Sequence, residues 1–462
     1  MKFFYIDKEI QNQKLRDFLK LDTYSEIAFQ RSSFKEIINN SVKDKLDIIF
    51  TKESEIQSDE EVSVYWCSNV IFIELETQKK FLRKLLSSPF NLFFGDHQGF
   101  VYKGTALGLR NFLFHQDHGD LIFLRDEPNL KSINSIFDFR NIISENSHSR
   151  YFNTLIKKGQ EFIKESSDIK KLEEEFSFLD NVPASIQGYY VKVSDFKTNT
   201  GKASYRMERQ PGMDLSVRYI TDSISYESLK NIFVILEKYF ESLQGIKVIG
   251  SRKELDFILN KNEARLIELQ SWAEYGRLNE FISNHTIFSS VDSMFSLVND
   301  LLLSNEKSFS SKGSLFSHGD LCFSNMILSE AEDSIIFIDP RGGDSFRTPY
   351  YDLAKISHSL LGGYDHIINN KASICFNSDM TAFLDFDMNK DKSVKDLFNS
   401  FLESGDYKPE IVALVQVSLF LSMLPLHIDD TKKVYMLALR ASELISVIKD
   451  TKIDEQYIGK KR

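Results

Sequence analysis

The chain has 462 residues, which is more than one hydrophobic core usually serves, so two or three domains are expected. Its 42% hydrophobic and 27% charged residues are ordinary for a folded soluble protein. The net charge of −10 argues against a general binder of nucleic acid or anionic membranes. An anionic nucleotide would therefore need a dedicated pocket or a metal.

The cysteine pattern and the apolar runs favour a cytoplasmic protein. The three cysteines are far apart and odd in number, which predicts neither a disulfide framework nor a zinc site. Charged residues from Asp7 onward interrupt the first apolar segment, so no secretory signal is expected. The longest uncharged apolar run starts at Ile411 and contains Pro425. We expect a buried helix that ends near this proline, and no stable membrane insertion.

Residues 1–135 form the first predicted domain, a small α/β domain. Two helical stretches alternate with short strand-like runs, and the turn signal "GDHQG" separates two of those runs. No glycine-rich nucleotide loop occurs here, which disfavours an active nucleotidyltransferase. An acceptor-binding or dimerising role, with a homo-oligomer as one outcome, fits better.

Residues 136–210 are predicted to form a strand-rich lobe. Three strands are expected first, from "SIFDFRNII", "RYFNTLIKKG" and "QEFIKES", with the polar loop 144–149 after the first. The stretch "SDIKKLEEEFSFLDNV" has apolar residues near helical spacing and Ser167 as an expected cap. "GYYVKVSDF" and "ASYRMERQ" then predict two more strands.

Residues 211–462 are predicted to be mostly helical, with one strand hairpin inserted. A strand-rich lobe followed by a helix-rich lobe is an α+β architecture that places a cleft where the two meet. We therefore expect a two-lobed fold that is preceded by the N-terminal α/β domain.

The residues most indicative of chemistry surround that hairpin, in "FSHGDLCFSNMILSEAEDSIIFIDPRGGD". Phosphoryl transfer needs a carboxylate that accepts the substrate hydroxyl proton, together with oxygen ligands for Mg²⁺. Asp320 suits the first role and Asn325 part of the second. The runs "MIL" and "IIFI" predict a hairpin that returns Asp339 beside Asn325 as a further metal ligand.

"HGDLCFSN", "IIFIDPRGGD" and "YYDLAKISH" resemble the catalytic core of the aminoglycoside phosphotransferase and choline kinase family, which has a two-lobed protein-kinase-like fold. "IDPRG", "YDLAK" and "SMLPLHID" are most similar to bacterial members of capsule and surface-polysaccharide biosynthesis. The resemblance covers about residues 136–440. It implies ATP and Mg²⁺ as cofactors, a sugar-like small-molecule acceptor, and polysaccharide-biosynthesis partners.

The resemblance also implies roles for single residues. In the helical lobe, Asp320 resembles the catalytic base, Asn325 and Asp339 the Mg²⁺ ligands, His318 a structural member of the catalytic loop, and Asp352 the buried acid that steadies that loop. In the strand-rich lobe, the implied nucleotide-binding residues are Lys164, Glu175, Met207, Glu208 and Arg209. Lys164 would hold the phosphates and pair with a helix glutamate, Met207 would line the adenine pocket, and the backbone of the last two would present hydrogen bonds.

Several of these positions have a second interpretation. Glu174 competes with Glu175 as the partner of Lys164, because a slip of one residue rotates a helix position by about 100°. His318 is more simply a hydrogen-bonded structural histidine than a proton carrier. Arg341 could meet substrate or phosphate, or could belong to a solvated turn. His427 could line a substrate pocket or could end a helix.

The sequence departs from the family pattern at loop 144–149, "SENSHS", which contains no glycine at the position of the phosphate-covering loop. Glycine allows the closest backbone approach to phosphates. This departure motivates an alternative function, a nucleotide-binding pseudokinase that regulates or scaffolds the N-terminal domain. Transfer of a nucleotidyl group to protein is a third interpretation, disfavoured by the intact catalytic-loop pattern. For the kinase, an amino alcohol or an aminoglycoside stays open as acceptor beside a sugar.

Overall fold

The computed structural model describes most of the chain. The described residues are 2–19, 21–29, 32–35, 39, 48–52, 55, 63–67, 70–72, 91–94, 99–115, 121–123, 130–135, 138–139, 153–220, 224–246, 253–311, 315–343, 346–369, 371–386 and 392–448. The chain divides into two compact units, Met1–His148 and Ser149–Arg462. They are called unit 1 and unit 2 below.

Unit 1 is built on a mixed sheet with the strand order β4-β1-β5-β8-β7-β9. The strands are β1 (Lys2–Ile6), β4 (Ile48–Thr51), β5 (Ser63–Cys67), β7 (Asn91–Phe94), β8 (Gly99–Gly104) and β9 (Leu121–Phe123). Its helices include α1 (Gln13–Leu19) and α4 (Ala106–His115), and its short strands are β2 (Ala28–Phe29), β3 (Ser32–Ser33), β6 (Val70–Phe72) and β10 (Leu130–Ser132). The predicted α/β character is confirmed, and β7 and β8 pair antiparallel on either side of "GDHQG" as expected.

The strand predicted from "SIFDFRNII" is wrong at the two residues that lie in a described element. Asp138 and Phe139, inside "SIFDFRNII", are helical. The Ser135 hydroxyl accepts a hydrogen bond from the Asp138 amide at 3.1 Å and donates to its carboxylate at 2.9 Å. This local side-chain capping favours a helical turn over an extended strand. Loop 144–149 lies outside the described residues.

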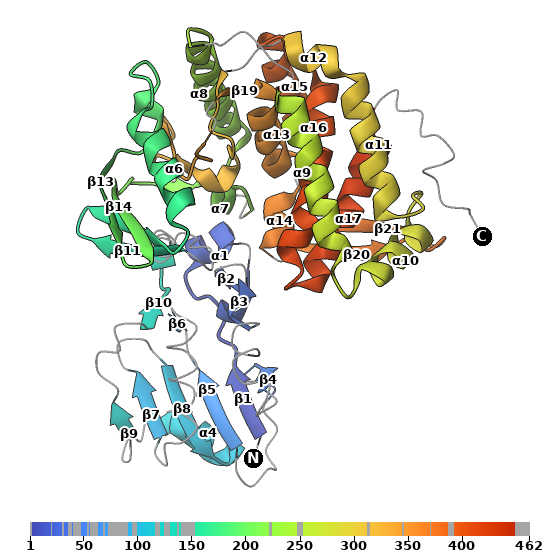
Figure 1. Ribbon diagram of the computed structural model, residues 1–462. Coiled ribbons are helices and arrows are strands. Elements are labelled where there is room, and N and C mark those ends of the chain that lie inside the picture. The colour runs from blue at the N-terminus through green and yellow to red at the C-terminus, as the bar shows by residue number, and fades with distance from the viewer. Residues whose placement is uncertain are drawn as a thin grey trace. The chain divides into compact units, whose positions relative to one another are not determined.

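The N-terminal part of unit 2 is a four-stranded antiparallel sheet in the order β11-β12-β14-β13, with helix α6 beside it (Figure 1). The strands are β11 (Asn153–Lys158), β12 (Glu161–Ser166), β13 (Val193–Asn199) and β14 (Lys202–Glu208), and the helix is α6 (Ile169–Asp180). The predicted hairpin and helix are confirmed. The cap is Asp168 rather than Ser167, because the Asp168 carboxylate accepts the Lys171 amide at 3.2 Å. The strand expected at 188–196 begins later, after the short helix η4 (Gln187–Tyr189).

The remaining, larger part of unit 2 is mainly helical, as predicted. Its helices are α7 (Leu215–Ile220), α8 (Tyr226–Gln244), α9 (Lys253–Gln270), α10 (Tyr275–His285), α11 (Val291–Ser304), α12 (Glu306–Ser311), α13 (Pro349–Leu360), α14 (Tyr364–Ile368), α15 (Lys392–Ser404), α16 (Pro409–Met423) and α17 (Thr431–Ser446). A small sheet, β15 (Met213–Asp214), β17 (Met326–Leu328) and β18 (Ile335–Phe337), contains the expected hairpin. The other pairs are β16 (Leu315–Phe316) with β19 (Phe346–Arg347), and β20 (Ala372–Phe376) with β21 (Ala382–Phe386).

Helix α16 is the centre of the helical part, where it packs against α9, α11, α13 and α17 (Figure 1). The helix is followed by the short helix η6 (Leu424–His427), so the predicted end near Pro425 is confirmed. Pro409–His427 is the one segment of the described chain that is long and apolar enough to cross a bilayer, and 72% of it is buried inside the protein. A helix that is apolar on all sides is expected at the centre of a large core.

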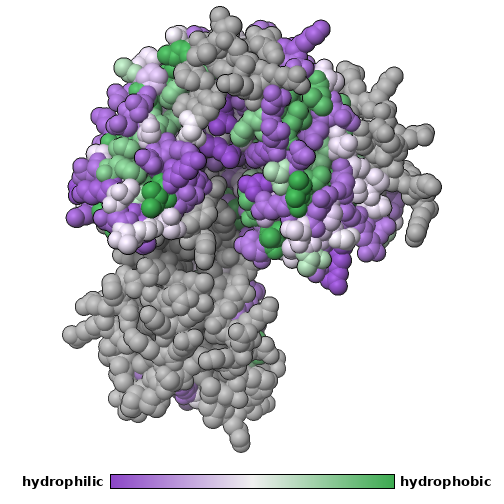
Figure 2. Space-filling model, in the orientation of Figure 1, coloured by the Kyte–Doolittle hydropathy of each residue, from purple (hydrophilic) through white to green (hydrophobic). Residues whose placement is uncertain are grey.

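The strand-rich and helical parts of unit 2 together confirm the predicted α+β, two-lobed fold class. In Figure 2, hydrophilic residues gather around a hollow between these two parts. The candidate site residues come from both parts, and their contacts are described next.

Candidate active site

Asp352 holds the loop that precedes Asp320. This carboxylate lies on α13 and is 1% exposed. It accepts hydrogen bonds from the Ser317 hydroxyl at 2.7 Å, the His318 amide at 2.8 Å and the Gly319 amide at 2.8 Å. A buried carboxylate is stable only when its oxygens are satisfied in this way. Asp352 therefore holds the Ser317 side chain and the backbone of His318 and Gly319.

Gly319 needs to be glycine for two reasons. Its φ angle is +76°, in the left-handed region that L side chains avoid. An added Cβ would also lie 2.9 Å from the Cβ of Arg341. The loop can therefore turn sharply and place Asp320 immediately after the Asp352-bound segment.

His318 has both ring nitrogens in hydrogen bonds. Its Nδ1 accepts from the Asp320 amide at 3.2 Å, and its Nε2 donates to the Ile338 carbonyl at 2.9 Å. Burial lowers the pKa of His318 below its usual range, despite the nearby carboxylate of Asp352. A neutral imidazole with both nitrogens occupied ties the loop to β18. This geometry suits a structural residue rather than a proton carrier.

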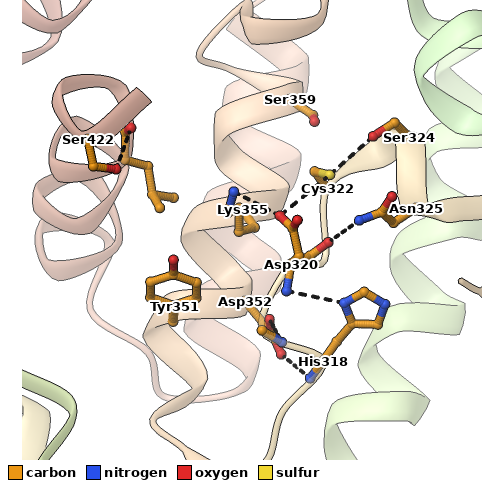
Figure 3. A network of polar contacts seen from close by, with 12 residues as sticks. His318, Asp320, Cys322, Ser324, Asn325, Tyr351, Asp352, Lys355, Ser359 and Ser422 are labelled. Atoms are coloured by element: carbon orange, nitrogen blue, oxygen red, sulfur yellow. Dashed lines mark hydrogen bonds and ion pairs between the residues drawn. The ribbon is translucent and has the colours of Figure 1, made fainter. Parts of the chain in front are cut away.

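Asp320 is bound through both its side chain and its backbone (Figure 3). Its Oδ1 lies 2.8 Å from the Nζ of Lys355, one turn after Asp352 on α13. Its backbone carbonyl accepts a hydrogen bond from the Asn325 side-chain amide at 2.8 Å. Burial lowers the pKa of Lys355, but the charge of Asp320 and the nearby Tyr351 outweigh burial, so the pKa is raised. Lys355 therefore stays charged and orients the Asp320 carboxylate.

The hairpin β17–β18 places Asp339 near Asn325. Met326 pairs with Phe337, and the Ile338 amide donates to the Asn325 carbonyl at 3.0 Å. Asp339 follows directly and has a φ angle of +54°, which is uncommon for a residue other than glycine. Strained backbone of this kind is frequent at functional sites. The Asn325 amide nitrogen is engaged with Asp320, so its oxygen remains as the atom available to a cation.

Lys164 connects the two parts of unit 2. Its Nζ lies 2.5 Å from Glu175 Oε1 and 2.9 Å from Asp339 Oδ1. The Tyr205 hydroxyl donates to the same Glu175 oxygen. Burial lowers the pKa of Lys164, but the two carboxylates outweigh burial and raise it. The sheet, α6 and the hairpin thus contribute to one charged cluster.

The choice between Glu175 and Glu174 is settled by this contact. Glu175 is 5% exposed and bonds Lys164, whereas the Glu174 side chain is 41% exposed and lies 4.0 Å from Lys170. Glu174 has a different role, because its backbone touches Gly342. A Cβ added to Gly342 would lie 2.2 Å from the Glu174 carbonyl carbon. Glycine thus lets the segment after Asp339 lie directly against α6.

We expect Gly342→Ala to force α6 away from this segment and to weaken the Lys164 contacts with Glu175 and Asp339. Stability should fall by about 1–3 kcal/mol, as for other overpacked positions, and nucleotide-dependent stabilisation should fall with it. Thermal unfolding with and without Mg·ATP measures both effects. Gly188→Ala is the matched control, because a Cβ there would meet nothing within 4 Å. Equal behaviour of the two variants would show that the close contact is unimportant.

The predicted adenine-binding segment lies at the end of β14. Met207 is 8% exposed, and it faces Phe162 of β12 across the sheet. The amide of Glu208 donates to the Lys192 carbonyl at 3.1 Å, and that of Arg209 donates to the Gln160 carbonyl at 2.9 Å. Both N–H groups are thus used within the protein, and the hydrogen bonds that the backbone of Glu208 and Arg209 would present to a nucleotide stay a prediction. The location of the adenine pocket stays a prediction.

Arg341 and His427 have different neighbours in the structure. The Arg341 amide donates to the His318 carbonyl at 2.8 Å, and its guanidinium lies 5.7 Å from the ring centre of Phe257. Arg341 is therefore part of the catalytic-loop neighbourhood and not a distant turn. His427 is buried at the end of η6, with its ring centre 6.4 Å from that of Tyr364. A substrate contact for either residue stays a prediction.

Sequence reasoning missed three residues that support the site. They are Lys355, which pairs with Asp320, Tyr205, which bonds Glu175, and Ser317, which bonds Asp352. A signal existed for Lys355, because it lies in the quoted "YYDLAKISH" on the same predicted helix as Asp352. Nothing in the local sequence marked Tyr205, since its partner comes from a different element.

Comparisons with known proteins gave structural neighbours only. No protein-family model matches the chain, and no curated protein matches it. A thermostable mutant of the aminoglycoside phosphotransferase APH(4)-Ia is 9% identical, with 65% of this chain and 95% of that chain covered and a TM-score of 0.41. The GDP complex of an aminoglycoside 2'-phosphotransferase-IIIa mutant is 10% identical, covering 65% and 90% with a TM-score of 0.43.

An ethanolamine kinase from Plasmodium vivax is 13% identical, covering 70% of this chain and 90% of that chain with a TM-score of 0.35. These neighbours are small-molecule phosphotransferases. Such low identities and TM-scores transfer neither an activity nor a residue's role to this chain. The functional assignment below therefore rests on the contacts of its own residues.

Proposed function

We propose that this chain is an ATP- and Mg²⁺-dependent phosphotransferase that phosphorylates a hydroxyl of a small polar acceptor. The observation that supports it most is the convergence of Lys164, Glu175 and Asp339 on one side and Asp320 and Asn325 on the other. A charged lysine held by a buried glutamate suits nucleotide phosphates. A carboxylate on a rigid loop suits the hydroxyl that attacks them.

The residues present fit a magnesium ion. Mg²⁺ usually takes one or two protein oxygens and fills its other positions with phosphate oxygens and water. Asp339 offers the oxygen that Lys164 does not bind, and Asn325 offers its amide oxygen. Among the described residues no group of three or more His, Cys, Asp and Glu side chains forms an all-protein metal site, which agrees with a metal that arrives with its nucleotide. When bound, Mg²⁺ would neutralise charge on the phosphates.

Asp320 carries out the proton chemistry in this proposal. Its carboxylate would orient the acceptor hydroxyl and accept its proton as the phosphoryl group is transferred. Lys355 holds that carboxylate in place, while His318 and Asp352 fix the backbone before it. Lys164 would hold the phosphates of ATP, with Glu175 keeping the lysine in position.

The finer parts of the proposal depend on sequence resemblance. On the basis of this resemblance, we propose a sugar or sugar derivative as the acceptor. We likewise propose a cytoplasmic location and a role in capsule or surface-polysaccharide synthesis. Residues 1–135 would then serve acceptor binding or dimerisation. The alternative of a catalytically inactive nucleotide-binding module makes a different prediction in the experiment described next.

We expect Mg·ATP to raise the midpoint of thermal unfolding, because a ligand that binds only the folded state stabilises it. At 100 times Kd the gain is about 2.7 kcal/mol. Asp339→Ala should remove the Mg²⁺-dependent part of this rise, since it deletes the carboxylate ligand. Asp333→Ala is the matched control, because Asp333 is an exposed carboxylate on the hairpin turn.

Two outcomes would contradict the assignment. An unchanged Mg²⁺-dependent rise in Asp339→Ala would exclude Asp339 as a metal ligand. If saturating Mg·ATP did not stabilise the wild-type protein at all, the phosphotransferase function would be excluded. The protein would then have a function that does not involve a nucleotide. Stabilisation by Mg·ATP without turnover of any acceptor would favour the inactive module.

A further inference from the structure

A group of four cationic side chains lies beside Asp320. It consists of Lys261 on α9, Arg341, Arg347 on β19 and Lys355 on α13, and is called the basic cluster below. Tyr351 lies at its centre, one turn before Lys355 on the same helix (Figure 3). The Nζ of Lys261 donates to the Tyr351 hydroxyl at 3.0 Å, and the guanidinium of Arg347 lies 5.9 Å from the centre of the Tyr351 ring.

The basic cluster has more positive charge than the carboxylates of the described residues balance by ion pairs. Lys355 pairs with Asp320, and Arg341 is exposed to solvent, but no carboxylate of the described residues forms an ion pair with Lys261 or Arg347. Arg347 is 7% exposed, and its Nε has no hydrogen-bond partner within the described part of unit 2. Burying a cation without a partner is costly, so such charges are normally paired. The imbalance is therefore a feature that requires an explanation.

The pKa values of Tyr351 and Lys261 are both shifted in the basic cluster. Burial raises the pKa of Tyr351, but Lys261, Lys355 and Arg341 outweigh it, so the pKa is lowered. Burial lowers the pKa of Lys261, and the hydroxyl of Tyr351 only partly opposes this. The Tyr351 shift is that of a hydroxyl surrounded by cations, whereas the Lys261 shift is due first to burial.

The basic cluster is adjacent to the reacting position. A Cβ placed on Gly319 would lie 2.9 Å from the Cβ of Arg341 and 3.5 Å from the Nε of Arg347. Gly319 directly precedes Asp320, and Lys355 contacts Asp320 itself. An anion held by the cluster would thus be within the length of a small molecule from the carboxylate that accepts the hydroxyl proton.

We propose that the acceptor carries an oxyanion, a phosphate or a carboxylate, which binds to Lys261, Arg347 and Tyr351 next to Asp320. Guanidinium and ammonium groups form their strongest hydrogen bonds with these two groups. A cationic acceptor, such as choline or an aminoglycoside, would instead be repelled by the cluster. That the bound molecule is the phosphoryl acceptor depends on the proposed phosphotransferase function. The existence of an oxyanion-binding site does not depend on it.

The test is thermal unfolding of the full chain in sodium phosphate, sodium acetate and sodium chloride at equal ionic strength. All samples contain saturating Mg²⁺ and the ATP analogue AMP-PNP, which occupies the nucleotide phosphate positions. We expect phosphate to raise the midpoint above the chloride reference, in addition to the rise from the nucleotide. A similar rise in acetate would extend the site to carboxylates, and a rise in phosphate alone would restrict it to phosphorylated acceptors.

Lys261→Met and Tyr351→Phe identify the site. Each removes one hydrogen-bonding group, and the apparent affinity for phosphate should become about tenfold weaker in Lys261→Met, the loss of about 1.4 kcal/mol. Lys238→Met removes the same charge from an exposed position of α8 and should leave the phosphate effect unchanged. Without phosphate, Lys261→Met should be at least as stable as the wild type, because it removes a poorly paired cation.

Failure of this inference can be told from failure of the proposed function. Stabilisation by AMP-PNP together with no effect of phosphate and acetate over chloride would overturn the oxyanion site alone. An equal phosphate effect in wild type, Lys261→Met and Tyr351→Phe would overturn it as well, because the anion would bind elsewhere. A Lys261-dependent phosphate effect without any effect of AMP-PNP would support the oxyanion site and contradict the phosphotransferase.

Discussion

Asp320→Asn should lower the turnover of ATP by about 10²–10⁴-fold, because an amide cannot accept the proton of the attacking hydroxyl. Stabilisation by Mg·ATP should be retained, since Lys164, Asn325 and Asp339 do not depend on the Asp320 side chain; only its backbone carbonyl contacts Asn325. The measurement is turnover with an accepted acceptor, together with thermal unfolding in Mg·ATP. Such a pattern would separate the chemical step from nucleotide binding.

The same substitution has a second effect that needs a control. Lys355 loses its carboxylate partner, so the folded protein itself should become less stable. Asp320→Asn combined with Lys355→Met tests this, because stability should recover while turnover stays low. Asp180→Asn changes an exposed aspartate and should alter neither quantity. Wild-type turnover by Asp320→Asn would remove this residue from the mechanism.

Asp352→Asn should destabilise unit 2 strongly. One oxygen of the carboxylate accepts from Gly319, and the other accepts from both Ser317 and His318. An asparagine keeps one acceptor and turns an NH₂ group toward donors, so at least one buried donor loses its partner, at about 1–3 kcal/mol each. Denaturant unfolding measures the loss in free energy of unfolding.

Turnover of Asp352→Asn should also fall, even where the protein remains folded, because the loop before Asp320 would no longer be fixed. Asp385→Asn is a suitable control, since Asp385 is exposed on β21 and its replacement should change stability by less than about 0.5 kcal/mol. Should Asp352→Asn unfold at the same denaturant concentration as this control, the organising role of Asp352 would be refuted.

Local patterns explain why much of unit 2 was predictable from sequence. The apolar spacing of Leu172 and Leu179 predicted helix α6, although the choice between Glu174 and Glu175 came only from the structure, which places Glu175 against Lys164. The hairpin between Asn325 and Asp339 follows from two short apolar runs with polar residues between them. The helix and the hairpin each depend on residues that are neighbours in sequence, so the sequence pattern is enough to predict them.

Contacts between distant elements could not be predicted in this way. Lys261 and Tyr351 are separated by 90 positions, and Lys355 and Asp320 come from a helix and a loop. A lysine on a helix gives no local sign of whether solvent, a carboxylate or a tyrosine will meet it. The partners of the Glu208 and Arg209 amides could not be predicted for a related reason, because their acceptors, the carbonyls of Lys192 and Gln160, belong to neighbouring parts of the strand-rich lobe.

The direct contact of Gly342 with the backbone of Glu174 limits how unit 2 can adapt. A Cβ on Gly342 would meet the carbonyl group and the Cβ of Glu174 within 2.5 Å, and neither is the end of a flexible side chain that could move aside. The glutamate that positions Lys164 and the aspartate three residues before Gly342 must therefore shift together. The spacing between α6 and the Asp339 segment therefore has almost no room to vary.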